Sequence, residues 1–380
     1  MSVYQQAESI ELVHSGADYF SRLAGLLDEA RETVHLQTYI YKDDDTGRRV
    51  AAALRRAAAR GVQVWVMVDG YGSNDLPAEF IRDLQQAGVA FRFFRNLASF
   101  WHWRFGRTLH HKVVVVDAAQ ALVGGINIAD KYRGTAGETA WLDFAVYIRG
   151  QVCQQLFHLC ADIFYQEYWK KHRNARGQFA LLPGGDRSGR IAFRLNDWMR
   201  RRTEIYQSYT KGISAARQSL VIVASYFLPG RSVRQRLNAA VRRGVEVRIL
   251  LTGPSDIELS RVAEQYLAEW LLRRGMRVFQ WNHSVMHGKG ILTDGQWASL
   301  GSYNVNRLSR FRSLELNVDI ADPRFVQQFD LYLDDLLLRQ CVELTLENIP
   351  AFSSRWGRLK ARVAYHFSVY LMRVLFPGRR

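Results

Sequence analysis

The sequence contains one pattern of polar residues twice. The first copy consists of His110, Lys112, Asp117, Gly124 and Asn127, and the second copy of His287, Lys289, Asp294, Gly301 and Asn304. Each member is separated from its counterpart by the same number of positions. The sequence before the motif also recurs: residues 30–41 resemble residues 216–227, and residues 57–73 resemble residues 239–255. Self-similarity of this kind predicts two related structural units in one chain.

Each copy is predicted to form an α/β unit. Strand-like and helix-like segments alternate before both motifs, and this order favours a mixed sheet covered by helices. We expect the two units to pack as a pseudo-dimer. The predicted segments are a first repeat over 1–170, a linker over 171–190, a second repeat over 191–349 and a basic amphipathic tail over 350–380.

The spacing within the motif separates a chemical face from an apolar one. Because side chains of a strand alternate between its faces, His110 and Lys112 are expected on one face and Val113 and Val115 on the other. The chain should reverse at Asp117, and a second strand should return toward the histidine. Small residues after that strand would let the asparagine of the motif approach the same place.

Histidine, lysine and asparagine at one point are typical of a phosphate site. A neutral imidazole can act as a nucleophile or a base, and a second histidine can protonate the leaving alkoxide of a phosphodiester. Lys112, Lys289, Asn127 and Asn304 would stabilise the charge on the phosphate oxygens, and we count the two asparagines as substrate-binding. No metal or other cofactor is predicted.

Carboxylates are expected beside the two histidines, because a hydrogen-bonded carboxylate fixes the tautomer and the orientation of an imidazole. The candidates are Asp143 and Glu315, which lie in strand-like segments at unequal distances after the histidines. We count both among the substrate-binding residues. Asp117 and Asp294 belong to the predicted catalytic motif, but their place at hairpin turns favours a role in holding the loop. His111, on the opposite face from the catalytic histidine, is interpreted as structural.

Composition limits the partners that this chain can have. Its 380 residues are 48% hydrophobic and carry a formal net charge of +16, which is typical of a globular protein that attracts nucleic acid or an anionic membrane. Its three cysteines are too few for a disulfide framework or a four-ligand zinc site. We find no secretory signal and no run of about 18 apolar residues, so we expect any membrane contact to be peripheral.

Two segments suit contact with an anionic membrane. Residues 91–107 interleave aromatic residues with arginines, although an aromatic core cluster is the alternative. Residues 355–380 combine arginines with an apolar stripe at helical spacing and no acidic residue, as in a helix that lies in the headgroup layer. The stripe consists of Trp356, Leu359, Val363, Phe367, Tyr370 and Val374. A helix that packs on a partner or on the protein itself is the alternative.

The complete motif resembles a known signature. HHKVVVVDAAQALVGGIN (110–127) and HGKGILTDGQWASLGSYN (287–304) look like the two HxKxxxxD signatures of the phospholipase D superfamily, each with its trailing glycine and asparagine. The text of residues 36–73 and 86–94 is similar to the bacterial cardiolipin synthases of the B type. The resemblance covers roughly residues 8 to 345, and it implies the two-repeat fold of the superfamily.

The resemblance also implies an activity. It points to the transfer of a phosphatidyl group between two phosphatidylglycerol molecules through a phosphohistidine, with release of glycerol. By this resemblance His110 is the nucleophile and His287 the acid and base, with Glu315 orienting His110 and Asp143 orienting His287. The implied partners are the phospholipid substrate and an anionic membrane surface, with peripheral attachment at the cytoplasmic face of a bacterial inner membrane.

Other functions use the same chemistry. Phosphatidylethanolamine as donor, hydrolysis in place of transfer, and cleavage of nucleic acid are the alternatives, and the basic charge would suit a nuclease. The amphipathic tail and the upstream text favour the lipid enzyme, so no nucleic-acid partner is expected. A catalytically inactive membrane scaffold is disfavoured because both motifs are intact. The sequence does not specify the oligomeric state.

Overall fold

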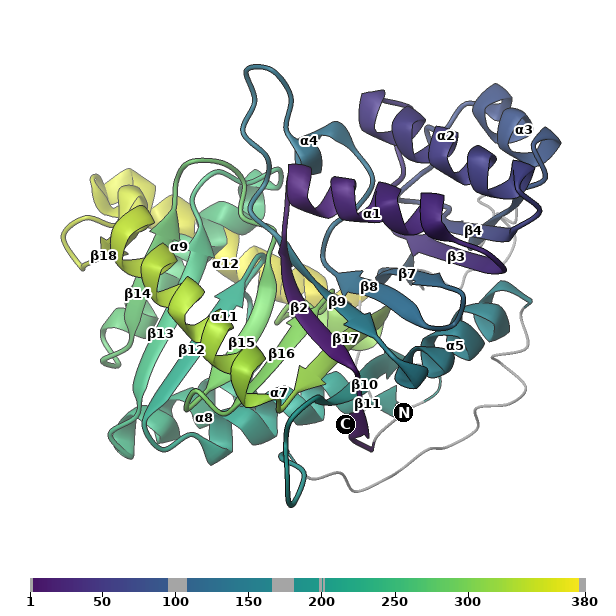
Figure 1. Ribbon diagram of the computed structural model, residues 1–380. Coiled ribbons are helices and arrows are strands. Elements are labelled where there is room, and N and C mark those ends of the chain that lie inside the picture. Colours follow the sequence, from purple (N-terminus) through teal and green to yellow (C-terminus); the bar gives the residue numbers. More distant parts are fainter. Residues whose placement is uncertain (1–2, 95–107, 166–180, 198–199, 201, 376–380) are drawn as a thin grey trace.

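The computed structural model describes residues 3–94, 108–165, 181–197, 200 and 202–375. Within these ranges the chain forms two mixed sheets with helices packed against them (Figure 1). The predicted class, two similar mixed-sheet α/β repeats followed by an amphipathic helix, is confirmed. Much of the predicted linker, residues 171–180, lies outside the described residues.

The first sheet is built from the first half of the chain. Its strands, in spatial order, are β2 (Ser9–His14), β9 (Phe144–Arg149), β8 (Gln120–Gly124), β7 (Lys112–Val116), β3 (Thr33–Thr38), β4 (Gln63–Asp69) and β5 (Ala90–Phe94). The strands β3, β4 and β5 run parallel, whereas β7, β8, β9 and β2 pair antiparallel. The motif hairpin β7–β8 therefore lies in the middle of the sheet.

The second sheet repeats this order. Its corresponding strands are β10 (Arg190–Asp197), β17 (Ser313–Ile320), β16 (Trp297–Gly301), β15 (Lys289–Thr293), β12 (Ser219–Ala224), β13 (Glu246–Thr252) and β14 (Arg277–Trp281). Four short strands are added, namely β1 (Gln5–Gln6) and β11 (Arg202–Thr203) on β10, β18 (Val342–Leu344) on β14, and β6 (Thr108–Leu109) on β17. Both β1 and β6 come from the first half of the chain, so each crosses to the other repeat.

Helices pack on both sheets, some on the outer faces and others against the core that the sheets share. Those of the first half are α1 (Ala17–Glu29), α2 (Asp45–Ala59), α3 (Ala78–Gln86), α4 (Asp130–Arg133), η1 (Gln151–Cys153) and α5 (Gln154–Phe164). Those of the second half are α7 (Glu204–Ala215), α8 (Arg231–Arg242), α9 (Glu258–Leu272), α10 (Arg307–Phe311), α11 (Pro323–Asp335), η3 (Leu336–Gln340), η4 (Pro350–Phe352) and α12 (Arg355–Leu375). No helix among the described residues is long and apolar enough to cross a membrane.

Local sequence explains where these helices begin and which face they bury. Helix α2 starts after Asp44, whose carboxylate accepts a hydrogen bond from the Gly47 amide, as expected of a residue that caps a helix. Its buried residues Val50, Leu54 and Ala57 recur at helical spacing, so α2 presents one apolar side to the sheet.

Strand β7 is buried on both faces, which corrects one expectation. Val113 and Val115 join an apolar core to which both sheets contribute, as the alternation predicted. Val114 and Val116 lie on the same face as Lys112, but they pack into a second core beneath the outer helices. The chemical face is therefore confined to the end of the strand, because helices cover the rest of it.

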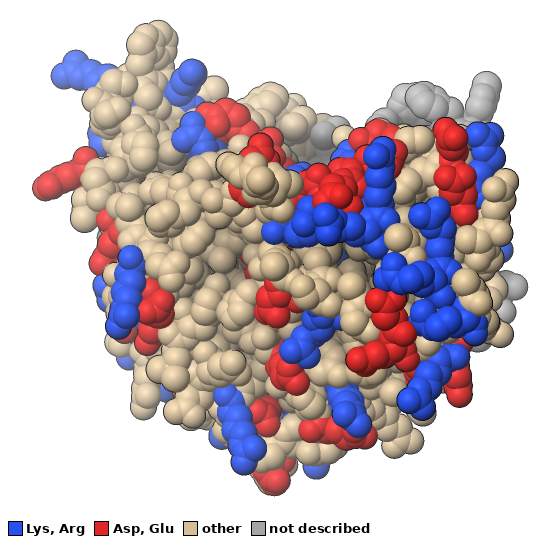
Figure 2. Space-filling model, turned by 45° about the horizontal axis from the view of Figure 1, so that its top comes forward, with Lys and Arg blue, Asp and Glu red and all other residues tan. Residues whose placement is uncertain are grey.

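Charged side chains are unevenly distributed over the surface. In the view of Figure 2, lysines and arginines alternate with acidic residues on the right, over the helices of the first repeat, and larger uncharged areas lie on the left. The excess of basic residues is not gathered into one patch on this face.

Candidate active site

Backbone hydrogen bonds between the repeats place the two motif histidines. His110 directly follows β6, which pairs in parallel with β17, and its amide donates to the Leu314 carbonyl at 3.0 Å. The His287 amide donates to the Leu142 carbonyl at 2.7 Å. Leu314 and Leu142 each immediately precede one of the two candidate carboxylates, so each histidine is fixed beside a carboxylate of the other repeat.

The side chains complete this exchange. Nδ1 of His110 lies 2.8 Å from Oε2 of Glu315, and Nδ1 of His287 lies 2.7 Å from Oδ2 of Asp143. The ring N–H donates to an ionised carboxylate in such a pair, and this fixes Nε2 as the atom that is available for chemistry. Nε2 is on the far side of each ring from its carboxylate.

The two carboxylates are supported differently. Glu315 accepts a second hydrogen bond from the Ser302 hydroxyl at 2.6 Å. Asp143 instead accepts from the Phe144 amide at 2.8 Å, and its Oδ1 would lie 2.5 Å from a Cβ at Gly125. The position after the motif glycine is Gly125 in the first copy and Ser302 in the second. A side chain at Gly125 would collide with Asp143, whereas the side chain of Ser302 binds Glu315.

Both motif lysines are buried beside the histidines. Nζ of Lys112 donates to the His110 carbonyl at 2.6 Å, and Nζ of Lys289 donates to the His287 carbonyl. Burial lowers the pKa of Lys112 to about 8 and that of Lys289 to about 7, although nearby carboxylates oppose the change. A bound phosphate would favour the charged form of both lysines.

The histidines differ in their electrostatic surroundings. Burial lowers the pKa of His110, while the negative charge of Glu315 opposes this shift. Lys112 and Lys289 add to the effect of burial on both rings, and without such an opposing charge the pKa of His287 lies well below its usual value. Burial also raises the pKa of Asp143 to about 7. A positive charge is therefore easier to place on His110 than on His287.

The motif asparagines hold neighbouring loops. Oδ1 of Asn127 accepts from the Ile40 amide at 2.9 Å, and its Nδ2 donates to the Tyr132 hydroxyl at 2.7 Å. Oδ1 of Asn304 accepts from the Ser225 hydroxyl at 3.1 Å. An amide nitrogen has two hydrogens, so Asn127 can give only one of them to a phosphate oxygen.

The motif aspartates lie at the far end of their strands. Asp117 accepts hydrogen bonds from the amides of residues 31–33, and Asp294 from those of residues 217–219. The length of β7 separates Asp117 from Lys112 by roughly 16 Å at the usual rise of a strand. Both aspartates adopt left-handed backbone conformations, with φ of 51° and 53°. They bind the loops that lead into β3 and β12.

Aromatic rings and one further carboxylate surround the site and were not predicted. The Tyr39 ring lies 5.0 Å from that of His110, whereas Tyr132 and Tyr226 lie 5.3 Å and 6.2 Å from His287. Asp69 accepts from the Leu109 amide at 2.7 Å and so holds the residue before His110. These residues occur singly and give no periodic signal, so sequence patterns could not select them.

The remaining predicted features are placed as follows. His111 is fully buried, and its Nε2 lies 2.8 Å from Oε1 of Gln37. Of the aromatic segment 91–107, residues 91–94 belong to β5 and residues 95–107 lie outside the described residues. Across the part of the chain that the structure describes, no group of three His, Cys, Asp or Glu side chains could hold a metal ion.

Comparison with known proteins agrees with this geometry. A family described as "Cardiolipin synthase, PLD-like domain" matches residues 23–156 and 209–337, one range in each repeat. The chain belongs to the cardiolipin synthase family of phospholipase D-like proteins. Cardiolipin synthase B of Escherichia coli is 32% identical over 96% of this chain and 88% of its own length. Cardiolipin synthase of Listeria monocytogenes is 26% identical over 96% of this chain and 75% of its own. The predicted resemblance is thereby confirmed.

Solved structures show that this cardiolipin synthase family shares its fold with other proteins. Phosphatidylserine synthase of Haemophilus influenzae covers 98% of this chain and 96% of its own, with a TM-score of 0.75 and 14% identity. Polyphosphate kinase of Porphyromonas gingivalis superposes with a TM-score of 0.61 at 13% identity, over 97% of this chain and 54% of its own. At such identities these likenesses concern the fold alone.

Proposed function

We propose that the protein is a cardiolipin synthase that moves a phosphatidyl group from one phosphatidylglycerol to a hydroxyl of a second, with release of glycerol. The pairing of each motif histidine with a carboxylate of the other repeat carries this proposal. It orients both imidazoles through their Nδ1 atoms, and a two-step displacement at phosphorus needs two such groups. The names of the relatives support phospholipid as the substrate class.

In the first step, Nε2 of His110 attacks the phosphorus of phosphatidylglycerol. The bond from phosphorus to the glycerol oxygen breaks, and protonated His287 gives its proton to that oxygen. Glycerol leaves, and the phosphatidyl group stays bound to His110. Because its proton is weakly held, His287 is a strong acid once the bound phosphate has favoured its protonation.

In the second step, the reaction runs in the opposite sense with a new alcohol. Neutral His287 takes the proton from a glycerol hydroxyl of the second phosphatidylglycerol, and that oxygen attacks phosphorus. The bond between phosphorus and Nε2 of His110 breaks, which releases cardiolipin. Both histidines return to their starting protonation states.

The surrounding charges support His110 as the nucleophile. Attack at phosphorus turns this imidazole into a cation, whose Nδ1 proton points to Glu315. The charge of Glu315 favours that cation, whereas the environment of His287 opposes a lasting positive charge. Lys112 and Lys289 would stabilise the negative phosphate oxygens.

The other motif residues support this site. Asn127 and Asn304 would hold the loops beside the histidines and offer an amide hydrogen to the phosphate. Asp117 and Asp294 would act at a distance, because they hold the loops before β3 and β12. We assign neither aspartate a contact with the phospholipid.

We further propose peripheral attachment to an anionic membrane, at the cytoplasmic face of a bacterial inner membrane. The relatives named above come from bacteria, and the chain carries a formal net charge of +16. Positive charge attracts a protein to anionic headgroups, where its substrate would lie.

Product analysis tests the proposed reaction. Purified protein is incubated with phosphatidylglycerol vesicles in the presence of a metal chelator, and the lipids and the released glycerol are measured. We expect cardiolipin and glycerol in equal amounts, and a loss of at least about a thousandfold in rate for His110→Ala and for His287→Ala, since each removes an obligatory group.

Two results would refute this function. One is an absence of cardiolipin together with cleavage of single-stranded DNA by the same preparation. The other is substantial transfer by either histidine variant, which would show that the second imidazole is dispensable.

A further inference from the structure

Helix α12 is bound to the protein by its less apolar face. Ala361, Ala364, Tyr365 and Ser368 are buried, and the helix packs along α9. The Tyr365 hydroxyl accepts a hydrogen bond from Arg234 at 3.0 Å. Small residues permit this close approach of two helices. One face of α12 therefore packs on the protein itself, which was the alternative to membrane contact.

The apolar stripe predicted from the sequence lies on the opposite, outward face. Its residues Trp356, Leu359, Val363, Phe367, Tyr370 and Val374 are all exposed, and Trp356 is 76% exposed. A helix on the surface of a soluble domain usually turns such a stripe inward. A contiguous apolar stripe of this kind marks a surface that contacts another phase or molecule.

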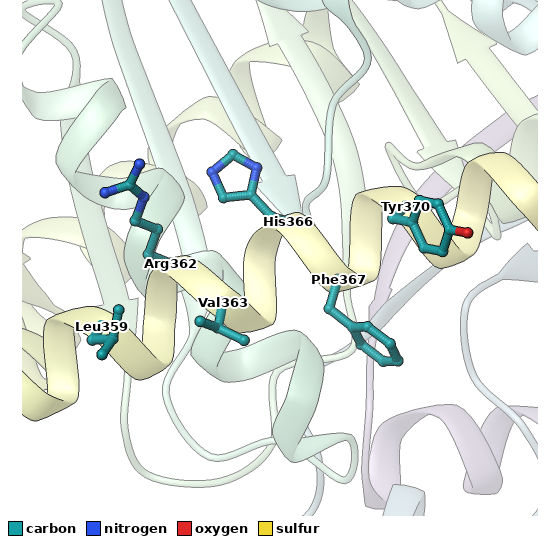
Figure 3. Close-up of a pocket in the computed structure, with 6 residues that line it drawn as sticks. All are labelled: Leu359, Arg362, Val363, His366, Phe367 and Tyr370. Carbon is teal, nitrogen blue, oxygen red and sulfur yellow. The ribbon is translucent and has the colours of Figure 1, made fainter.

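The close-up in Figure 3 shows six side chains of α12 that line a pocket along this face. Arg362 and His366 project to one side of the helix, whereas Phe367 projects to the other side and Val363 lies between them. The pocket has a volume of about 420 Å³ and is lined by α12 alone. Basic groups therefore border an apolar surface, as they do on helices that lie between headgroups and acyl chains.

The charge of α12 selects the kind of partner. Its basic residues are Arg355, Arg358, Lys360, Arg362 and Arg373, and residues 355–375 include no Asp or Glu. An anionic lipid surface complements this charge. A symmetric contact with a second copy would instead bring the same basic groups together, which disfavours such a dimer.

The start of α9, the helix on which α12 packs, leads toward the active site. Exposed Ile257 and Leu259 lie at the start of α9, next to Asp256. The Asp256 carboxylate accepts from the Tyr226 hydroxyl at 2.6 Å, and the Tyr226 ring lies 6.2 Å from His287.

The other end of α12 lies near the second motif. Helix α10, which follows Asn304 closely, contacts α12 and exposes Leu308. Burial, together with the positive charges of Arg310 and Arg373, lowers the pKa of Arg307, which places the end of α12 beside α10.

From this arrangement we infer that the outer face of α12, with Leu308 and the start of α9, is a docking face for an anionic bilayer. The choice of a bilayer as occupant rests on the phospholipid substrate proposed above. Because α12 is held on α9, the face is rigid, and it fixes the active site at the level of the headgroups. The protein would thus contact the membrane through a folded surface of the second repeat and not through an unstructured tail.

Point substitutions on the outer face test this inference without uncovering α9. The variant Val363→Ser with Phe367→Ser removes two side chains that are 58% and 50% exposed. The matched control, Leu331→Ser with Leu338→Ser, removes side chains that are 65% and 62% exposed on α11 and η3. Flotation of the full chain measures binding to vesicles of equal parts phosphatidylglycerol and phosphatidylcholine, and to vesicles of phosphatidylcholine alone.

We expect the α12 variant to lose at least about tenfold in binding to the mixed vesicles, because two inserted side chains are lost. The control should bind as the unaltered protein does, and both variants should melt within about 3 °C of it. Binding to phosphatidylcholine alone should be weaker for every protein.

Three results would overturn the docking face. These are unchanged binding of the α12 variant, an equal loss in the control, and a solution dimer that this variant dissociates while vesicle binding persists. Turnover of phosphatidylglycerol by the unaltered protein is measured separately. If binding is lost selectively but no cardiolipin forms, the docking face stands and the proposed function fails.

Discussion

At the scale of residues, the two halves of the site differ in one useful way. Glu315 takes a hydroxyl hydrogen bond from Ser302, whereas Asp143 sits over Gly125 and takes a backbone amide. The same motif thus holds two histidines in unlike electrostatic surroundings. The proposed division of labour uses this difference, because the nucleophile must carry a positive charge in the intermediate whereas the acid must give up its proton.

The buried lysines predict how phosphate binding depends on pH. The pKa values of Lys112 and Lys289 are lowered to about 8 and about 7, so both ammonium groups lose their charge as the pH rises through this range. A soluble phosphonate analogue of phosphatidylglycerol keeps its single negative charge throughout. We expect its dissociation constant, measured calorimetrically, to rise by about tenfold or more between pH 6 and pH 9.

A lysine variant provides the control for this pH dependence. Lys289→Met should bind the phosphonate more weakly at pH 6 and should lose the part of the dependence that lies near pH 7. Equal affinity of the unaltered protein at pH 6 and pH 9 would contradict the role of the lysines.

Sequence patterns could identify the residues that repeat, but not those that occur once. His110, Lys112 and their counterparts stand out because a fixed spacing recurs in the chain. Asp69 accepts from the Leu109 amide, and the corresponding Thr252 hydroxyl accepts weakly from the Met286 amide at 3.3 Å. Because the matching positions hold different residue types, a comparison of the two sequence repeats could not reveal this shared role.

At the scale of elements, the motif hairpins depend on their aspartates. Each carboxylate gathers several backbone amides of the loop before the neighbouring strand. The loop, the hairpin and the strand are thereby held as one unit, with the lysine and histidine at its other end.

We expect Asp117→Ala to lower the free energy of unfolding by about 1–2 kcal/mol, since hydrogen bonds to three partly solvated amides are lost. Urea unfolding measures this change. Asp43→Ala, which removes an exposed ion pair with Arg48, is the control and should cost less than about 1 kcal/mol.

Turnover per folded molecule should stay close to that of the unaltered protein in Asp117→Ala. A variant of full stability that has lost turnover would place Asp117 in contact with the substrate and would contradict the supporting role.

Helix α12 shows the limit of periodicity as a guide. Helical spacing predicted the stripe and the helix, but it could not tell which face meets the protein. Ala361, Ala364 and Ser368 carry little hydrophobic signal, yet they are buried on the same face of α12 as Tyr365, whose ring lies 5.2 Å from that of Tyr266 on α9. Close packing of small residues decides the orientation, and it is visible only when the partner helix is known.

At the scale of the whole molecule, neither repeat contains a complete site. His110 needs Glu315 from the second repeat, and His287 needs Asp143 from the first. The pairing of β6 with β17 joins the repeats directly before His110, although β6 is only two residues long. So short a strand has no recognisable pattern, so the duplication predicted the two units but not the contacts that align them.

The most direct test of this account is to locate the covalent intermediate. The protein is mixed with phosphatidylglycerol, quenched within milliseconds in denaturant at basic pH, and its peptides are analysed by mass spectrometry. The account predicts a phosphatidyl group on His110, reduced at least about tenfold in Glu315→Gln because the cationic imidazole loses its carboxylate. An adduct on His287 alone, or cardiolipin formation with no adduct on either histidine, would contradict it.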